Sequence, residues 1–293
     1  MTPHPYRFGI GGLPGSLPEL REHVRRYDEL GFDFVSKGDH IGGLSPFPLL
    51  AAAAAASERL RLRTYVLNTC FWNPALLARD AATLDQISGG RLELGLGSGT
   101  VKSEFEAADI PWRYLDARIG QLRQTLVSVR QALADQDQEP RPVQRPIPML
   151  VGAMSRRGLA VAAEFAEVIA FGAVRHKPGH PPGTLTAATA EETDVLVAAT
   201  RRDAGSRPFE SDVLLQRVEL GKDPLAAARA FVEGERDPDD PMVLAESPCV
   251  LFARSAADAA AEIERRRERW GFTSMTTFAP SSDALAAVAR ELR

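Results

Sequence analysis

The sequence is poor in cysteine, has no long hydrophobic run and carries no excess of positive charge. Its two cysteines, Cys70 and Cys249, are too few for a disulfide framework and fit a reducing cytoplasm. The apolar run at 49–56 is far too short to span a bilayer. The formal net charge of −4 provides no basic footprint for nucleic acid. We therefore expect a cytoplasmic protein that acts on neither membranes nor nucleic acids.

What the chain does have is an alternation of strand and helix patterns from end to end. Its 293 residues are 44% hydrophobic and 25% charged, which gives ample core for a globular protein. We expect strands at 7–10, 32–36, 60–67, 92–96, 148–151, 167–171, 213–220, 249–253 and 273–278, with helices between them. Roughly eight strand–helix units in succession favour a closed parallel barrel over an open sheet. The sequence thus predicts an α/β protein, a single (β/α)8 TIM barrel over 1–293 with a loop insertion around 173–210.

The stretch 71–99 is the most informative part of the chain. A helix pattern stops at the glycine pair 89–90, because glycine readily adopts the left-handed conformation that ends a helix. The strand that follows carries Gly95, Gly97 and Gly99, so its far end has almost no side chains. Such a strand end lets a flat or anionic ligand approach the backbone. This is the first indication of a cofactor enzyme.

Asp39 and His40 follow the expected strand 32–36. In a barrel both would lie at the C-terminal rim, where barrel enzymes keep their active sites. Histidine titrates near neutral pH and can exchange a proton with a reacting carbonyl or alcohol. The alternative is a helix N-cap pair, in which Asp39 bonds backbone amides and His40 is a surface side chain. The position at a strand end favours function, with His40 as the catalytic residue.

Two more strand ends carry polar groups. Asn68 follows the strand 60–67 and could bond a planar heterocycle, although a strand-ending turn explains it equally well. Its neighbour Cys70 is better explained as a small buried hydrophobe than as a nucleophile. Residues 152–155 form a turn before a helix, and their backbone amides with the Ser155 hydroxyl suit a phosphate. An ordinary N-capped helix is the equal alternative.

No metal site is expected. His176 and His180 have four-residue spacing, but the Pro-Gly between them prevents a shared helical face. The glycine run 95–99 lacks the third-glycine spacing and the distal acid of a dinucleotide fingerprint.

Three stretches together resemble the luciferase-like monooxygenase superfamily. They are Ser-Lys-Gly-Asp-His-Ile at 36–41, Asn-Pro-Ala-Leu-Leu-Ala at 73–78, and the run 82–99. Within the superfamily the chain is most similar to the deazaflavin-dependent oxidoreductases, whose coenzyme is called F420. The resemblance is strong over 1–172 and thin over 173–247.

The resemblance implies a TIM barrel with a flavin or deazaflavin phosphate bound at the C-terminal rim. It implies a cis peptide between Tyr65 and Val66 that bulges against the cofactor's ring system. It places Asp39 at the pyrimidine-like end of the ring and makes His40 the proton donor or acceptor during hydride transfer. The other cofactor-binding residues are then Asn68, Gly97, Ser98, Gly152, Ala153, Met154, Ser155 and Phe171.

Two departures from the family pattern bear on the substrate. Sugar-phosphate dehydrogenases of this family carry a tryptophan soon after the Asp-His pair and a glutamate after the fourth-strand glycines. This chain has Gly-Gly-Leu at 42–44 and Thr100 in those places. We therefore expect a substrate other than a sugar phosphate, and the acid partner in proton transfer is unassigned.

The sequence thus favours an F420-dependent oxidoreductase that acts on a small organic molecule, with a homodimer as a candidate assembly. One alternative is an FMN-dependent monooxygenase fed reduced flavin by a partner reductase. Another is a phosphate-binding barrel lyase or aldolase, for which Lys37 is the only lysine near a suitable strand end. A third is a cofactor-binding protein without catalysis, suggested by the absent glutamate. The substrate and the direction of hydride transfer stay open.

Overall fold

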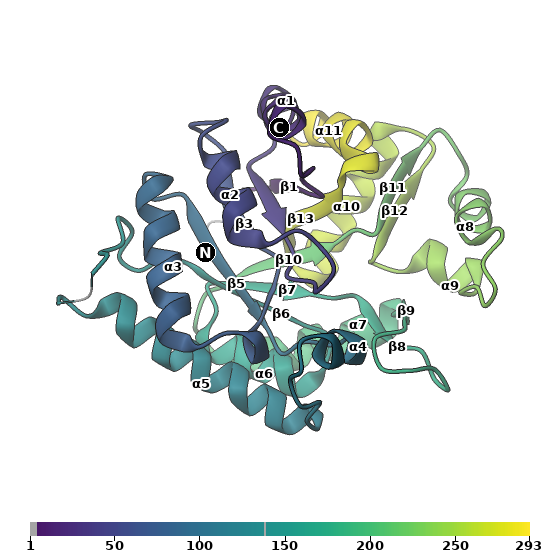
Figure 1. Cartoon of the computed structure of the whole chain (residues 1–293). Coiled ribbons are helices and arrows are strands. Elements are labelled where there is room, and N and C mark those ends of the chain that lie inside the picture. The colour runs from purple at the N-terminus through teal and green to yellow at the C-terminus, as the bar shows by residue number, and fades with distance from the viewer. Residues whose placement is uncertain (1–4, 138) are drawn as a thin grey trace.

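A closed parallel barrel forms the centre of the protein (Figure 1). The computed structural model describes residues 5–137 and 139–293. Within them the barrel strands are β1 (Arg7–Gly11), β2 (Phe34–Lys37), β3 (Arg61–Thr64), β5 (Leu92–Gly97), β6 (Met149–Ala153), β7 (Val168–Phe171), β10 (Glu210–Leu214) and β13 (Phe272–Phe278). Because β3 pairs with both β2 and β5, the sheet closes on itself. The predicted TIM-barrel fold is confirmed.

A helix follows each barrel strand and covers its outer face. These helices are α1 (Leu17–Glu29), α2 (Pro46–Ala54), α3 (Pro74–Ile87), α5 (Leu115–Ala134), α6 (Arg156–Phe165), α7 (Ala190–Ala204), α10 (Ala256–Trp270) and α11 (Ser282–Glu291). In α3 the buried side chains include Leu77, Ala81 and Leu84, at the spacing of one helical face. Gly271 ends α10 in the left-handed conformation, which glycine adopts at low cost.

The alternate glycines of the 95–99 segment make room for a neighbouring strand. That strand is β3, which continues after a short break as β4 (Leu67–Asn68). A Cβ atom on each glycine would lie too close to one partner: 1.9 Å from the Thr64 carbonyl oxygen for Gly95, 2.6 Å from Val66 Cγ2 for Gly97, and 2.5 Å from Asn68 Nδ2 for Gly99. The missing side chains therefore first admit the strand, and only through it shape a ligand site.

The stretch 173–210 is not the loop insertion that the sequence predicts. It contains an antiparallel hairpin, β8 (Val174–His176) and β9 (Leu185–Ala187), and then the barrel helix α7. The larger departure from a plain barrel comes after β10. We call residues 215–255 the excursion; it contains β11 (Arg217–Leu220), α8 (Pro224–Val232), α9 (Pro241–Glu246) and β12 (Val250–Ala253).

The excursion corrects two strand predictions. Strand β11 pairs with β12 in a separate parallel sheet outside the barrel. The predicted strand 213–220 is therefore divided between barrel and excursion, and 249–253 is not a barrel strand. A strand of the barrel and a strand of the excursion are both buried and both have an apolar sequence pattern. The pattern alone therefore could not tell which sheet a predicted strand joins.

Charged side chains from several strands meet inside the barrel. Arg63 is fully buried and contacts Glu93 at 2.6 Å and Asp212 at 3.2 Å. Arg7 also reaches Glu93, at 2.5 Å, and the Arg63 guanidinium lies 3.6 Å from the centre of the Phe34 ring. The buried charges are thus paired with one another, as burial requires.

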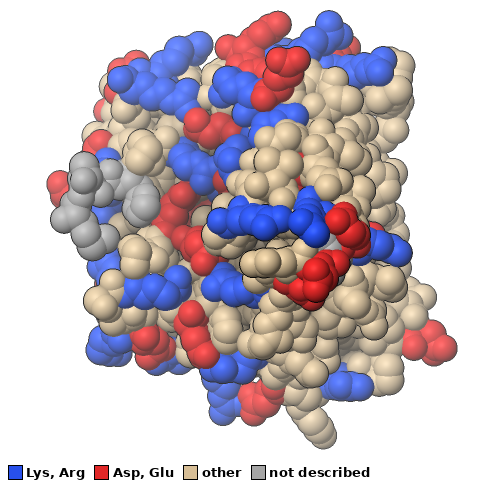
Figure 2. All heavy atoms as spheres, turned by 90° about the vertical axis from the view of Figure 1, so that its left-hand side faces the viewer, with Lys and Arg blue, Asp and Glu red and all other residues tan. Residues whose placement is uncertain are grey.

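Charges of both signs mix on the described surface of the side where α3 and α5 lie (Figure 2). Figure 2 shows lysine and arginine interspersed with aspartate and glutamate over that face. No helix among the described residues is long and apolar enough to cross a membrane.

Candidate active site

A cleft opens at the C-terminal ends of the barrel strands. Eleven of the twelve predicted site residues line it: Asp39, His40, Tyr65, Val66, Asn68, Gly97, Ser98, Gly152, Ala153, Met154 and Ser155. They come from the ends of four neighbouring strands, which a barrel brings to one rim. Their roles toward a ligand stay predictions, but the structure brings them together.

Phe171 is the exception and a correction. Its side chain is 2% exposed and packs on Phe272, with ring centres 5.6 Å apart. Successive residues of a strand point to opposite faces, so the neighbours Ala170 and Gly172 line the cleft in its place. The prediction chose the right strand end and the wrong face.

His40 has a carboxylate partner that the sequence did not reveal. Its Nδ1 lies 2.7 Å from Glu104 Oε1, on the short helix α4 (Lys102–Ala107). The family pattern has its glutamate at the position that Thr100 occupies here, and Glu104 lies four residues beyond that position. A carboxylate on one ring nitrogen fixes the tautomer and leaves the other nitrogen, Nε2, for a ligand. Glu104 is therefore a candidate for the acid partner that the sequence left unassigned.

The Asp39 carboxylate holds the next strand end in place. Its Oδ2 accepts hydrogen bonds from the Trp72 indole N–H at 2.8 Å and from the Asn68 backbone N–H at 3.3 Å. These bonds join the ends of β2 and β4. The role expected for Asp39, direct contact with a cofactor ring, is thus joined by a second one, positioning Asn68.

Asn68 presents an unused donor to the cleft. Its Oδ1 accepts from the Cys70 backbone N–H at 3.2 Å, whereas its Nδ2 is buried and finds no partner in residues 5–137 and 139–293. The residue is 4% exposed. Because buried donors are nearly always bonded, the free Nδ2 points to a ligand acceptor.

The floor of the cleft is formed by Tyr65 and Val66, and the peptide between them is cis, as the resemblance implies. The Tyr65 hydroxyl lies 3.5 Å from Asp212 Oδ1, so this residue reaches from the cleft into the barrel interior. Burial raises the pKa of Tyr65 well above its usual value, and Asp212 adds to the rise. Tyr65 is therefore a neutral phenol.

Residues 152–155 form the turn before α6 that the sequence assigned to a phosphate. The Ser155 hydroxyl accepts from the Gly158 backbone N–H at 3.1 Å, so its own hydrogen stays available to a ligand. A Cβ atom on Gly152 would lie 2.9 Å from Val66 Cγ1. Gly152 is thus needed for packing against the cleft floor, in addition to any contact with an anion.

Arg118 is the only lysine or arginine that lines the cleft, as far as the described residues go. It is 4% exposed, donates to the Gly99 carbonyl and lies 3.8 Å from the centre of the Trp112 ring. Its Nε has no hydrogen-bond partner within the part of the chain that the structure describes. The geometry gives it no carboxylate partner there, since its contacts are the Gly99 carbonyl and the Trp112 ring. Two nearby arginines on α6 are already paired, Arg156 with Asp203 and Arg157 with Asp116. Arg118 is therefore a buried cation that protein acids leave uncompensated.

The remaining candidates from the sequence have other settings. Burial raises the pKa of the Cys70 thiol, which fits the predicted apolar role. His176 lines the cleft from β8, while His180 pairs with Asp237 at 2.9 Å. Among the described residues no group of three potential ligands could hold a metal ion.

Among the described residues, sequence reasoning missed three titratable side chains of the cleft: Glu104, Arg118 and His176. Glu104 and Arg118 lie in segments whose charges resemble an ordinary solvated helix face. The usable signal was position, since Glu104 is the first acid after the strand-end glycines.

Comparison with known proteins fits this geometry. The sequence profile of the luciferase-like monooxygenase family matches residues 3–193. The chain belongs to the luciferase-like monooxygenase family. The match covers the barrel from β1 into α7, and so includes all of the strand ends that line the cleft except that of β10.

Curated members of the luciferase-like monooxygenase family match part of the chain. An F420-dependent glucose-6-phosphate dehydrogenase from Intrasporangium calvum is 37% identical over 123 residues, which is 38% of this chain and 37% of that protein. A 5,10-methylenetetrahydromethanopterin reductase from Archaeoglobus fulgidus is 31% identical over 126 residues, or 43% of this chain and 37% of that protein. The matched segments thus span well under half of either relative.

Solved structures extend the likeness of fold to the whole chain. An F420-dependent secondary alcohol dehydrogenase, determined with an F420–acetone adduct, superposes with a TM-score of 0.75 at 17% identity. The superposition covers 99% of this chain and 100% of that one. At this identity the likeness concerns the fold alone.

Proposed function

We propose that the protein is an oxidoreductase that transfers hydride between coenzyme F420 and a small uncharged organic molecule. The observation that carries the proposal is one cleft that holds both the His40–Glu104 pair and the unused amide donor of Asn68. Relatives that match part of the chain are named as F420-dependent enzymes, which supports the choice of cofactor.

The cleft offers the groups that such a cofactor needs. Asn68 Nδ2 can donate to an oxygen of the ring or the ribityl chain, and Val66 provides an apolar surface for one ring face. The turn 152–155 offers the Ser155 hydroxyl and the start of α6, and Arg118 lines the same cleft, which together suit the phosphate. When bound, the deazaflavin supplies the ring carbon that gives or takes the hydride.

In this proposal His40 moves the proton that accompanies the hydride. Glu104 holds Nδ1, so Nε2 can accept the proton of an alcohol or donate one to a carbonyl oxygen. Glu104 also stabilises the imidazolium while it carries that proton. Asp39 does not move a proton in this proposal. Its bonds to the Trp72 indole N–H and to the Asn68 backbone N–H keep the cofactor site in shape.

The cleft favours an uncharged substrate. The one lysine or arginine that lines the cleft within the described part of the chain, Arg118, donates to the Gly99 carbonyl. The side chains of Val101, Val174 and Leu214 add apolar surface elsewhere in the cleft. No second cation is offered by the described residues for a substrate phosphate, so a small alcohol or ketone fits better than a sugar phosphate.

The rival functions receive less support. No lysine lines the cleft among the described residues, which removes the Schiff-base candidate of a lyase. Glu104 supplies the acid whose absence suggested a protein without catalysis. The FMN-dependent monooxygenase remains the second candidate, because the phosphate site suits either cofactor.

Fluorescence titrations with F420 and FMN test the proposal. We expect F420 to bind more tightly, and a panel of small alcohols to be oxidised with loss of deazaflavin absorbance in the absence of oxygen. Replacement of Arg118 by Gln should weaken F420 about 10-fold while sparing a deazaflavin that ends at the ribityl chain. Tighter binding of FMN with oxygen-dependent turnover would instead favour the monooxygenase.

Arg123 provides the matched control for Arg118. It lies on the same helix, is half exposed and pairs with Glu164. Arg123→Gln should leave the affinity for both deazaflavins unchanged.

A further inference from the structure

The β8–β9 hairpin separates the cleft from a second cavity. On one side Val174 and His176 line the cleft. On the other side lies a cavity formed with the excursion, and its lining includes Lys177, His180 and residues 184–187. A wall with open space on both sides cannot be held by core packing alone.

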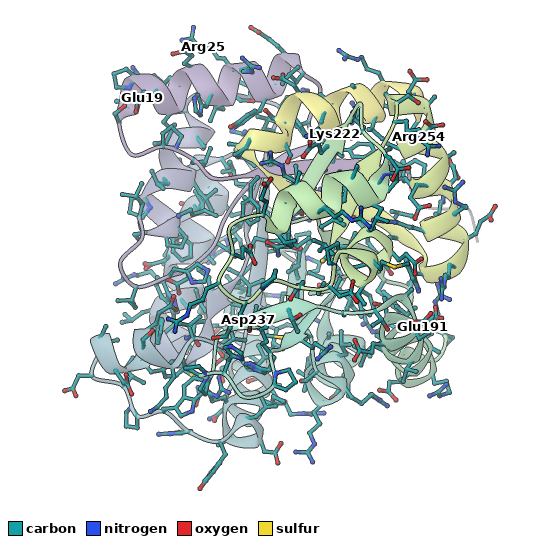
Figure 3. The ribbon with its side chains drawn as sticks, turned by 90° about the vertical axis from the view of Figure 1, so that its right-hand side faces the viewer. Glu19, Arg25, Glu191, Lys222, Asp237 and Arg254 are labelled. Atoms are coloured by element: carbon teal, nitrogen blue, oxygen red, sulfur yellow. The ribbon has the colours of Figure 1, made fainter. Side chains whose placement is uncertain are left out.

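Polar contacts from the loop between α8 and α9 hold this hairpin. Asp239 accepts from the Thr186 hydroxyl at 2.5 Å and from the Ala187 backbone N–H at 2.8 Å. Asp237 pairs with Lys177 at 2.8 Å and with His180 at 2.9 Å. Figure 3 labels Asp237 on the face where the excursion meets the hairpin. Asp239 therefore binds strand β9, and Asp237 binds two residues of the loop that follows β8.

The hairpin has few apolar anchors of its own. His176 and Leu185, which oppose each other across it, are both exposed, and of its six strand residues only Ala187 is buried. Its tip touches the start of α4, where the Lys102 backbone N–H donates to the Pro182 carbonyl at 3.5 Å. The tip therefore contacts the start of the helix that carries Glu104.

We propose that Asp237 and Asp239 are positioning residues that set the cleft wall from outside the cleft. Through the hairpin they place His176 and Val174 against the bound cofactor and substrate, and they support the segment that leads to Glu104. Loss of these contacts lets the hairpin move into the second cavity and opens the cleft. For its cofactor readout this inference rests on the proposed function.

Asp239→Ala tests the proposal by two measurements. Amide hydrogen exchange of the free protein should become about 10-fold faster within residues 174–187, because two hydrogen bonds to a carboxylate are lost. Release of F420 in stopped-flow experiments should accelerate by a similar factor. Glu219→Ala is the matched control, since Glu219 has the same 21% side-chain exposure and pairs with Lys222 within the excursion.

Asp237→Ala and Lys177→Met probe the second contact from its two ends. Each should accelerate exchange and release, and the acceleration in the double variant should be smaller than the product of the two single accelerations, because both changes break the Lys177–Asp237 pair. The double variant can still exceed either single one, since Asp237 also pairs with His180 and Lys177 also lies 3.8 Å from Asp239. The proposal is overturned if hairpin exchange stays at the wild-type rate in Asp239→Ala, or if F420 leaves that variant no faster than the wild type. It is also overturned if Glu219→Ala accelerates exchange and release as much as Asp239→Ala does. Should the wild type bind no F420, the proposed function fails, while the exchange measurement still decides whether the aspartates hold the hairpin.

Discussion

The barrel interior and the cleft at its rim both bury polar groups, but they satisfy them differently. In the interior, Arg63 contacts Glu93 and Asp212 across the barrel. In the cleft, Asn68 Nδ2 and Arg118 Nε have no partner among the described residues. Buried polar groups are costly unless they are bonded. The charge of Arg63 is therefore paired with carboxylates as the chain folds, whereas the cleft keeps donors that a ligand could bond.

Within the interior, two carboxyl groups respond to burial in opposite ways. Burial raises the pKa of Asp212 to about 6, against the pull of the single guanidinium that it contacts. Burial also opposes ionisation of Glu93, but three arginines, Arg63, Arg7 and Arg61, outweigh it and lower the pKa to about 2. The number of cationic partners, and not depth alone, decides the charge state.

The largest expected effect comes from the rim. His40→Asn keeps a polar side chain but removes the titrating group, so turnover should fall ~10²–10⁴-fold with F420 affinity nearly unchanged. Steady-state rates and fluorescence titration of the same protein give both numbers. Unchanged turnover with an unchanged pH profile would make His40 a rim residue without a chemical role.

The interior should respond in stability and not in binding. Glu93→Gln leaves buried arginines without their shared carboxylate and should cost about 3–5 kcal/mol of unfolding free energy. Urea denaturation followed by tryptophan fluorescence measures this cost. Glu164→Gln, which breaks an exposed pair with Arg123, should cost less than about 1 kcal/mol. Equal losses would mean that the interior cluster contributes no more than a surface pair.

The same variant has a characteristic pH dependence. The lowered pKa of Glu93 contributes stability that is present above its usual value near 4.5 and lost as the pH falls toward 2. The difference in unfolding free energy between wild type and Glu93→Gln should therefore shrink over that interval. A difference that is constant with pH would place the effect in packing instead of charge.

The smallest effect tests the unsatisfied donor. Asn68→Ala removes the free Nδ2 and should weaken F420 about 5- to 10-fold, the value of one hydrogen bond. Asn68→Asp keeps an acceptor for the Cys70 backbone N–H and should lose a comparable amount, because it offers no donor. If Asn68→Asp binds as the wild type does, the amide is not a cofactor contact and the contrast with the interior weakens.

Most of the barrel could be predicted from the sequence because its units are local. Pro74 and the glycine pair 89–90 mark the limits of α3 by their own backbone preferences. The excursion could not be predicted, because pairing of β11 with β12 is a long-range choice that a buried strand pattern does not encode. The hairpin was taken for a loop since its two strands are short and the segment between them is rich in prolines and glycines.

Site residues at the ends of strands could be predicted from the sequence, whereas site residues carried by helices could not. Asp39, His40 and Asn68 follow strands, so the barrel itself gathers them. Glu104 and Arg118 reach the cleft from α4 and α5, and their placement depends on how those helices pack. Phe171 shows the remaining limit, since a shift of one residue exchanges the two faces of a strand.

The alternate glycines at 95, 97 and 99 have a consequence for the evolution of such barrels. Each faces one residue of the segment 64–68, so a side chain can appear at a glycine position only if that segment is reshaped at the same time. The two segments must therefore change together, and substitutions in one should covary with substitutions in the other across relatives. A Gly-x-Gly-x-Gly run at this place in another barrel would accordingly indicate that the preceding strand passes close to it. It would not by itself indicate which ligand the barrel binds.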